Sequence, residues 1–119
     1  MSQHRNIETG AAGESVAAAY YERLGWSVLD RNWRTRDGEI DLIVQRDGTV
    51  AFCEVKARTS DRYGGGAAAV TVRKQSTIRR VAIAWLNAQE RRWRELRFDV
   101  VVVTPGHHGS AVELIEGAF

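Results

Sequence analysis

Two short segments of this chain place carboxylates among apolar residues. One segment reads GEIDLI from residue 38, and the other reads FCEVK from residue 52. If both are strands, Glu39 and Asp41 share a face, because side chains two residues apart point the same way. The same holds for Glu54 and Lys56. Charges on a mostly apolar sheet are costly unless they are paired or bind a metal. The two segments therefore indicate a divalent-metal site.

The segment before these motifs is predicted to form a helix and a short strand. Apolar residues at four-residue spacing predict a helix over residues 9–24, which Gly25 would end. A short strand is expected over residues 26–29, followed by a polar segment over residues 30–37. Glu14 would lie on the helix face that carries small residues, and not in a charged stripe.

The two motif segments are predicted to form a hairpin. We expect strands over residues 38–45 and 50–57, antiparallel to each other. Asp47 and Gly48 between them are a strong hairpin signal, because this dipeptide favours a tight turn. A hairpin of this kind would bring the carboxylates of the two motifs close together.

The rest of the chain is predicted to hold a second helix and one or two more strands. A glycine-rich loop over residues 59–67 precedes a helix over residues 71–88. Extending the apolar stripe of this helix back by one turn reaches Lys74 and Gln75, which we expect on its buried side. Residues 98–104 read as a strand that is covered on both faces. Residues 110–116 could form a last strand or a short helix.

Length and composition are those of one globular domain over residues 1–119, with residues 1–7 expected to be disordered. The single cysteine, Cys53, cannot form an intramolecular disulfide, which fits a reducing compartment. No apolar run is long enough to span a membrane, and no charged leader with an apolar stretch begins the chain. We therefore expect a cytoplasmic protein without a membrane partner.

One stretch of the chain is strongly basic. Residues 71–97 hold eight Lys or Arg residues against two acidic residues, within a net charge of +2. Such a cluster can attract nucleic acid, although a solvated helix face has the same composition. Fifteen of the basic residues are Arg, and only Lys56 and Lys74 are Lys. This bias suggests that a compact ammonium group is needed at those two positions.

The order of these groups resembles that of PD-(D/E)XK nucleases, the restriction-endonuclease-like superfamily. Asp41 matches the motif aspartate, and Glu54 and Lys56 match the E-x-K. Together with Gly13 and Glu14, the two motifs are similar to the YraN-like bacterial proteins over residues 6–104. The spacing and the helical glutamate are also similar to archaeal Holliday-junction resolvases. Ile40 stands where the named motif has proline, which is a geometric preference only.

The resemblance implies a fold and an activity. The fold would be α/β and restriction-endonuclease-like, with a mixed central β-sheet of four or five strands flanked by helices in α-β-β-β-α-β order. The activity would be that of a Mg²⁺- or Mn²⁺-dependent endonuclease acting on DNA, with branched or processed structures as candidate substrates. Junction resolvases work as dimers, so a homodimer is also implied, although no separate apolar stripe marks an interface.

The resemblance also implies roles for the site residues. Asp41 and Glu54 would bind one metal ion, and Glu14 would bind a second ion or a metal-bound water. Lys56 would orient the attacking water or stabilise charge on the phosphate. Gln75 would hold the carboxylate of the third strand or contact the phosphate.

The remaining basic residues are candidates for contacts to nucleic acid. Lys74 would contact the nucleic-acid backbone, and Arg36, Arg58 and Arg73 are further candidates. Glu39 is an extra carboxylate. It is either another metal ligand or the partner of an arginine such as Arg36 or Arg58.

Other interpretations stay open. Glu54 and Lys56 could form an exposed ion pair on an edge strand. The same fold could bind nucleic acid without catalysis, or it could be a protein-interaction domain in which the carboxylates are structural. Trp33 and Trp93, which lie next to arginines, could stack on bases or pack in the core.

Overall fold

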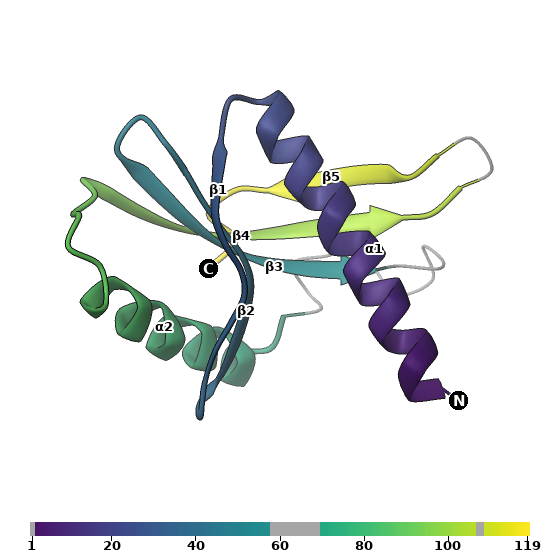
Figure 1. Cartoon of the computed structure of the whole chain (residues 1–119), viewed down its shortest axis with the longest axis horizontal. Coiled ribbons are helices and arrows are strands. Elements are labelled where there is room, and N and C mark those ends of the chain that lie inside the picture. Colours follow the sequence, from purple (N-terminus) through teal and green to yellow (C-terminus); the bar gives the residue numbers. More distant parts are fainter. Residues whose placement is uncertain (1, 58–69, 107–108) are drawn as a thin grey trace.

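The chain forms one five-stranded sheet with a helix on each face (Figure 1). The computed structural model describes residues 2–57, 70–106 and 109–119, with side chains from residue 12 onward. Its elements are α1 (Ser2–Arg23), β1 (Ser27–Thr35), β2 (Gly38–Arg46), β3 (Thr49–Ala57), α2 (Val72–Asn87), β4 (Glu95–Thr104) and β5 (Ala111–Ile115). Within these described residues, neither helix combines the length and apolar content needed to cross a membrane.

The sheet is mixed, and its strands lie in sequence order from β1 to β5. Strands β1, β2 and β3 are antiparallel neighbours, whereas β4 runs parallel to β3 after the crossover through α2. Strand β5 then returns antiparallel to β4. The expected α/β class, the mixed sheet and the antiparallel β2–β3 pair are confirmed. The tail adds a strand to the predicted order, because its apolar residues pair with the free edge of β4.

The turn between β2 and β3 has the geometry that its sequence predicts. Asp47 has a φ of 49° and Gly48 a φ of 82°, and the flanking residues Arg46 and Thr49 pair directly. Positive φ at both central residues is the requirement of a type I′ turn, whose twist matches that of the strands. This turn sets the register of the β2–β3 ladder and therefore the relative positions of the two motifs.

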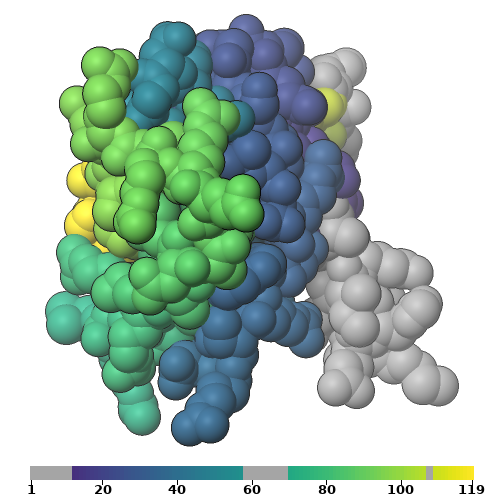
Figure 2. Space-filling model, turned by 60° about the vertical axis from the view of Figure 1, so that its left-hand side comes forward, coloured from purple at the N-terminus to yellow at the C-terminus, as the bar shows by residue number. Residues whose placement is uncertain are grey.

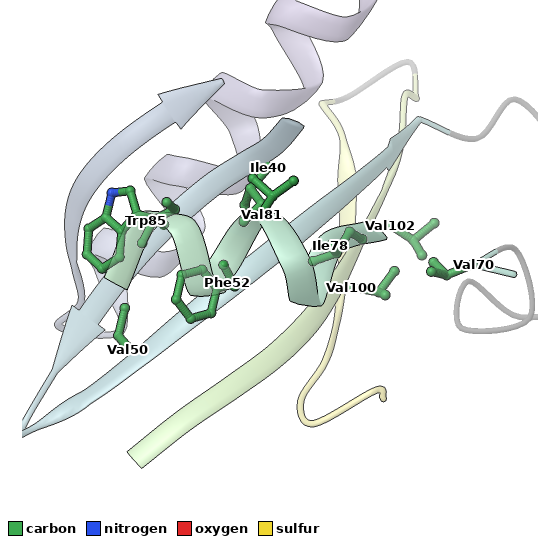
Figure 3. Close-up of a cluster of buried hydrophobic side chains, with 11 residues drawn as sticks. Ile40, Val50, Phe52, Val70, Ile78, Val81, Trp85, Val100 and Val102 are labelled. Atoms are coloured by element: carbon green, nitrogen blue, oxygen red, sulfur yellow. The ribbon is translucent and has the colours of Figure 1, made fainter. Parts of the chain in front are cut away.

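Each face of the sheet buries a separate apolar core. The core under α2 is shown in Figure 3 and consists of Ile40, Ile43, Val50, Phe52, Val70, Ile78, Val81, Ala82, Trp85, Val100 and Val102. The core under α1 consists of Ala17, Ala18, Tyr21, Trp26, Leu42, Val44, Ala51, Cys53, Val101 and Val103. Successive valines of β4 thus enter opposite cores, which confirms a strand covered on both faces.

Several element boundaries differ from the prediction. Helix α1 begins at Ser2, before the predicted start at residue 9 and within the segment expected to be disordered. No Pro or Gly interrupts residues 2–9. Strand β1 continues to Thr35 through the segment expected to be polar coil. An edge strand tolerates that composition, because its charged side chains reach solvent. Strand β4 begins at Glu95 because its first residues pair with the start of β3.

Candidate functional site

Asp41 and Glu54 lie where β2 and β3 separate. The last pair of the ladder between the two strands is Leu42 and Cys53. Asp41 directly precedes Leu42, and Glu54 directly follows Cys53. Both residues are buried, with exposed fractions of 9% and 8%. The Val55 backbone N–H donates to Oδ2 of Asp41 at 2.8 Å. The Asp41 side chain therefore replaces the backbone acceptor that β2 no longer provides.

An irregularity in β2 accompanies this separation. Ile40 and Ile43 both belong to the core under α2, whereas Leu42 and Val44 belong to the core under α1. Strict alternation would place residues 40 and 43 on opposite faces of the sheet. The alternation is therefore broken at Asp41 and Leu42, where pairing with β3 stops. Hydrophobic pattern alone does not predict this break.

Glu54 is electrostatically the most perturbed carboxylate of the site. Burial raises its pKa to about 8, and a hydrogen bond with Asp41 and the negative charge of Asp41 act in the same direction. The positive charges of Lys74 and Lys56 oppose the shift. Within the part of the chain that the structure describes, Oε2 of Glu54 is buried without a hydrogen-bond partner. An oxygen in this state is suited to bind a cation.

Lys74, and not Gln75, contacts this oxygen. The Lys74 ammonium lies 3.4 Å from Oε2 of Glu54, close enough for an ion pair but not aligned as a hydrogen bond. The Gln75 side-chain amide instead donates to the Val70 carbonyl at 3.1 Å. The prediction that Gln75 holds the carboxylate is therefore wrong, because Lys74 pairs with Glu54 instead. The contact of Gln75 with a phosphate and that of Lys74 with nucleic acid stay predictions. Adjacent helical residues point about 100° apart, so only one of them can face the same target.

Lys56 follows Glu54 on β3 and is half-buried. Its charge lowers the pKa of Glu54, which places it within electrostatic reach of the carboxylate pair. This effect is consistent with the prediction that Lys56 and Glu54 belong to the same site. The reading of the pair as a wholly exposed edge ion pair is wrong, because β3 is a central strand and Glu54 is buried.

Glu14 approaches the site from α1. Its pKa is raised chiefly by burial, and a hydrogen bond with Asn32 opposes that shift. The negative charges of Asp41 and Glu39 raise its pKa further. The first helix therefore brings a third carboxylate towards the start of β2. Glu14 is less buried than Glu54, which leaves it open to water.

Asn32 is a site residue that the sequence prediction missed. It lies in β1 with a φ of 50°, in the left-handed region that Asn adopts more readily than most residues. Its side chain is the hydrogen-bond partner that lowers the pKa of Glu14. The only signal in the sequence is an asparagine between two bulky residues of a polar segment. That signal does not reveal a positive φ within a strand.

Glu39 pairs with an arginine other than the two predicted. Nε of Arg34 donates to Oε2 of Glu39 at 2.9 Å, and the two residues are direct partners across the β1–β2 ladder. Cross-strand neighbours of opposite charge stabilise each other in this way. Arg36 is exposed in the following turn, and Arg58 lies outside the described residues. Glu39 is thus engaged by an ion pair at the edge of the sheet.

Two basic segments border the site. The β1–β2 turn carries Arg36, and the exposed first turn of α2 carries Arg73. The turn packs closely against the helix, because a Cβ added at Gly38 would lie 2.7 Å from Cγ2 of Thr77. Figure 2 shows the turn, in blue, and the start of the helix, in teal, projecting side by side. A hollow of about 320 Å³ under the turn is lined by Arg34, Thr35, Arg36, Asp37, Gly38 and Glu39.

The two tryptophans that could have stacked on bases pack instead. Trp33 and Trp93 are both partly buried against the core under α2. The indole N–H of Trp93 also donates to Oε1 of Gln45 at 3.0 Å. Packing is therefore the correct alternative for both side chains.

The donor set suits a hard divalent cation. Mg²⁺ and Mn²⁺ prefer oxygen ligands, and Mg²⁺ keeps several of its waters. Asp41, Glu54 and the Val55 carbonyl would hold such an ion, with Oε2 of Glu54, which has no hydrogen-bond partner among the described residues, as its main ligand. Across residues 2–57, 70–106 and 109–119, no group of three or more His, Cys, Asp or Glu side chains is arranged as ligands. Waters would therefore complete the coordination shell.

A third buried carboxylate, Asp99, lies opposite Cys53 in the β3–β4 ladder and was also missed. It is fully buried on β4 and accepts hydrogen bonds from the Tyr21 hydroxyl at 2.8 Å and from the Gly117 N–H at 3.1 Å. Arg97 donates two more, at 2.8 and 2.9 Å. The Asp99 carboxylate thus accepts four hydrogen bonds from groups of the protein, which indicates a structural role.

Comparison with known proteins places the chain in a family. The model of the uncharacterised protein family UPF0102 matches residues 13–103. A UPF0102 protein of Mycolicibacterium gilvum is 50% identical over 112 residues, covering 91% of this chain and 90% of the relative. One from Frankia casuarinae is 47% identical over 111 residues, covering 92% and 94%, and one from Rhodococcus opacus is 46% identical over 102 residues, covering 86% of each. The matched region contains Glu14, both motifs and Lys74. The chain belongs to the UPF0102 family.

Proposed function

We propose that the chain is a Mg²⁺- or Mn²⁺-dependent nuclease that hydrolyses phosphodiester bonds in DNA. The observation that carries this proposal is the buried Glu54 oxygen without a hydrogen-bond partner, beside Asp41 and near two lysines. A carboxylate pair with an adjacent ammonium is the combination that metal-assisted phosphodiester hydrolysis needs. Nothing in the apolar packing of β2 and β3 requires Glu54 to be charged.

Each residue would have a distinct task. A divalent ion bound here would polarise the phosphate and lower the pKa of a bound water. Asp41 and Glu54 would hold that ion. Lys56 would donate hydrogen bonds to the attacking water or to a phosphate oxygen, and it would neutralise charge that develops there. Glu14, half-buried in the middle of α1, would accept a hydrogen bond from a metal-bound water.

The topology supports the further proposal of a restriction-endonuclease-like fold. That fold requires an aspartate and an E-x-K motif on adjacent antiparallel strands, followed by a helical crossover to a parallel strand. Asp41 on β2 and Glu54 on β3 meet this requirement, and α2 leads to the parallel strand β4. Helix α1 covers the opposite face and carries Glu14.

Cleavage assays test the proposal. Purified protein with Mn²⁺ would be incubated with single-stranded, duplex, flap and four-way DNA, beside the variants Glu54→Ala and Lys56→Ala. We expect wild-type cleavage that chelation stops, and no cleavage by either variant although both still bind DNA. The variants also control for a contaminating nuclease. Absence of metal-dependent cleavage of every substrate by the wild type would reject the proposal.

A non-catalytic nucleic-acid-binding module is the second candidate. The observation that favours it is the Lys74–Glu54 ion pair, because the lysine neutralises the carboxylate without a metal ion. This candidate predicts DNA binding that persists after chelation and shows no turnover. Its affinity would fall with salt, and Arg36→Ala or Arg73→Ala would each reduce the slope of log K against log salt by about 1.

A further inference from the structure

Lys74 and a divalent ion would compete for one oxygen. Among the residues that the structure describes, Oε2 of Glu54 is buried without a hydrogen-bond partner, and the Lys74 ammonium is 3.4 Å from it. A metal ion bound to the same oxygen would bring two more positive charges to this position. Two cations this close repel each other strongly where protein shields them from water. The ammonium and the metal therefore cannot both stay on Glu54.

We propose that Lys74 is a displaceable counter-ion, which neutralises Glu54 in the metal-free protein and leaves it when a divalent ion binds. This inference rests on the proposed metal site and adds a moving part to it. Lys74 is then a positioning residue, because it acts through Glu54.

The contacts of Lys74 allow this movement. Its backbone is fixed, because the Thr71 side chain caps α2 and accepts a hydrogen bond from the Lys74 N–H at 3.1 Å. Its side chain is 41% exposed, whereas that of Glu54 is 9% exposed. The carboxylate is held in the protein, and the ammonium is on a flexible four-carbon stem at the surface. Displacement therefore moves the lysine outward, into solvent.

Arg73 provides a matched control for charge. It precedes Lys74 in the same helical turn and is exposed. Removal of either charge makes the surroundings of the metal less positive. Only removal of Lys74 also frees the Glu54 oxygen. A comparison of Lys74→Met with Arg73→Met therefore separates direct competition from general electrostatic attraction.

Calorimetric titration of the metal-free protein with Mn²⁺ gives the main test. We expect Lys74→Met to bind Mn²⁺ about three- to five-fold more tightly than the wild type, as loss of a competing partly exposed ion pair implies. Arg73→Met should stay within about two-fold of the wild type on the same scale. Equal or weaker binding by Lys74→Met, with the wild type still binding, would overturn the inference but keep the metal site. If no protein binds Mn²⁺, the metal site fails as well, and with it the proposed function.

Urea unfolding at pH 8 adds a second readout. Without metal, Lys74→Met should unfold at a lower urea concentration than the wild type, because Glu54 has lost its counter-ion. Saturating Mn²⁺ should close or reverse that gap. A gap that is the same with and without Mn²⁺ would show that Lys74 has only a structural role and would overturn the inference. Lys74→Gln allows the same comparison if Lys74→Met does not fold.

Discussion

The Asp41 carboxylate accepts a hydrogen bond from the Val55 backbone N–H at 2.8 Å, just beyond Leu42 and Cys53, the last pair of the β2–β3 ladder. This bond holds the two strands together at the point where their backbones separate. It also keeps the Asp41 carboxylate beside that of Glu54. Asp41 therefore has a structural role that is independent of the proposed metal, and the two roles can be separated by substitution.

Asp41→Asn and Asp41→Ala should have different effects on stability. The asparagine carbonyl can still accept from Val55, and it removes a charge beside Glu54, so the free energy of unfolding should be equal to that of the wild type or higher. Alanine leaves the Val55 N–H without its partner, at a cost of about 1–3 kcal/mol. Urea denaturation of the metal-free proteins measures both values. Mn²⁺ affinity should fall in both variants, and equal stability losses in the two would contradict the structural role.

The stability of the metal-free protein should decrease as the pH rises from about 5 to about 8. The pKa of Glu54 is raised from its ordinary value of 4.5 to about 8, chiefly by burial. The folded state therefore binds more protons than the unfolded state between these values, and the free energy of unfolding falls with rising pH. The contribution of Glu54 is fully present below its unfolded pKa and is lost as the pH passes the folded one.

Glu54→Gln isolates this effect. Glutamine has the shape of the protonated glutamate and does not titrate, so the fall in stability between pH 5 and 8 should be smaller by a few kcal/mol. Urea midpoints across this pH range measure the difference. Mn²⁺ should reduce the wild-type slope, because a bound cation stabilises the ionised carboxylate. An unchanged slope in Glu54→Gln would mean that another group causes the pH dependence.

Asp99→Ala should destabilise the fold strongly. The change leaves a partly buried guanidinium of Arg97 without its two hydrogen bonds, and it removes the acceptor of the buried Tyr21 hydroxyl. Removal of one partner of a buried ion pair costs about 3–5 kcal/mol. The surface variant Asp37→Ala is the control, and its effect should be within about 0.5 kcal/mol. A loss below about 1 kcal/mol for Asp99→Ala would show that the network contributes little.

Gly38→Ala should be destabilising because of a contact that the sequence does not show. The added Cβ would lie 2.7 Å from Cγ2 of Thr77, which belongs to a stiff, β-branched helical side chain. Overpacking of this kind costs about 1–3 kcal/mol. Thr77→Ser removes the methyl group, so the double variant should recover part of the loss. Strictly additive effects of the two changes in a double-mutant cycle would count against direct contact.

Local patterns predicted much of the fold. The positive-φ requirement of the Asp47–Gly48 turn, the alternation within β3, and the apolar run of β4 depend on near neighbours in the chain. The lengths of β1 and β4 were underestimated, because their polar ends are stabilised by pairing with strands that are distant in sequence. The tail was ambiguous for the same reason, since only the free edge of β4 makes it a strand.

Partner choice within the site could not be predicted. Arg34 was missed as the partner of Glu39 because a strand was not expected there, and cross-strand register decides that pair. Lys74, and not Gln75, pairs with Glu54 because the rotation of α2 about its axis depends on how the helix packs on the sheet. Asp99 looked like one acid in an apolar strand, and its partners lie on α1, on β4 and after β5.

The sequence by itself determined which chemical groups are available and which strands bring them together. Asp41, Glu54 and Lys56 could be placed on adjacent strands because the i, i+2 period and a tight turn are local properties. Only the tertiary structure decided which of these groups are buried, which are paired, and which oxygen lacks a hydrogen-bond partner. These properties depend on the packing of α1 and α2 over the end of the sheet, and that packing is set by contacts between residues far apart in the chain.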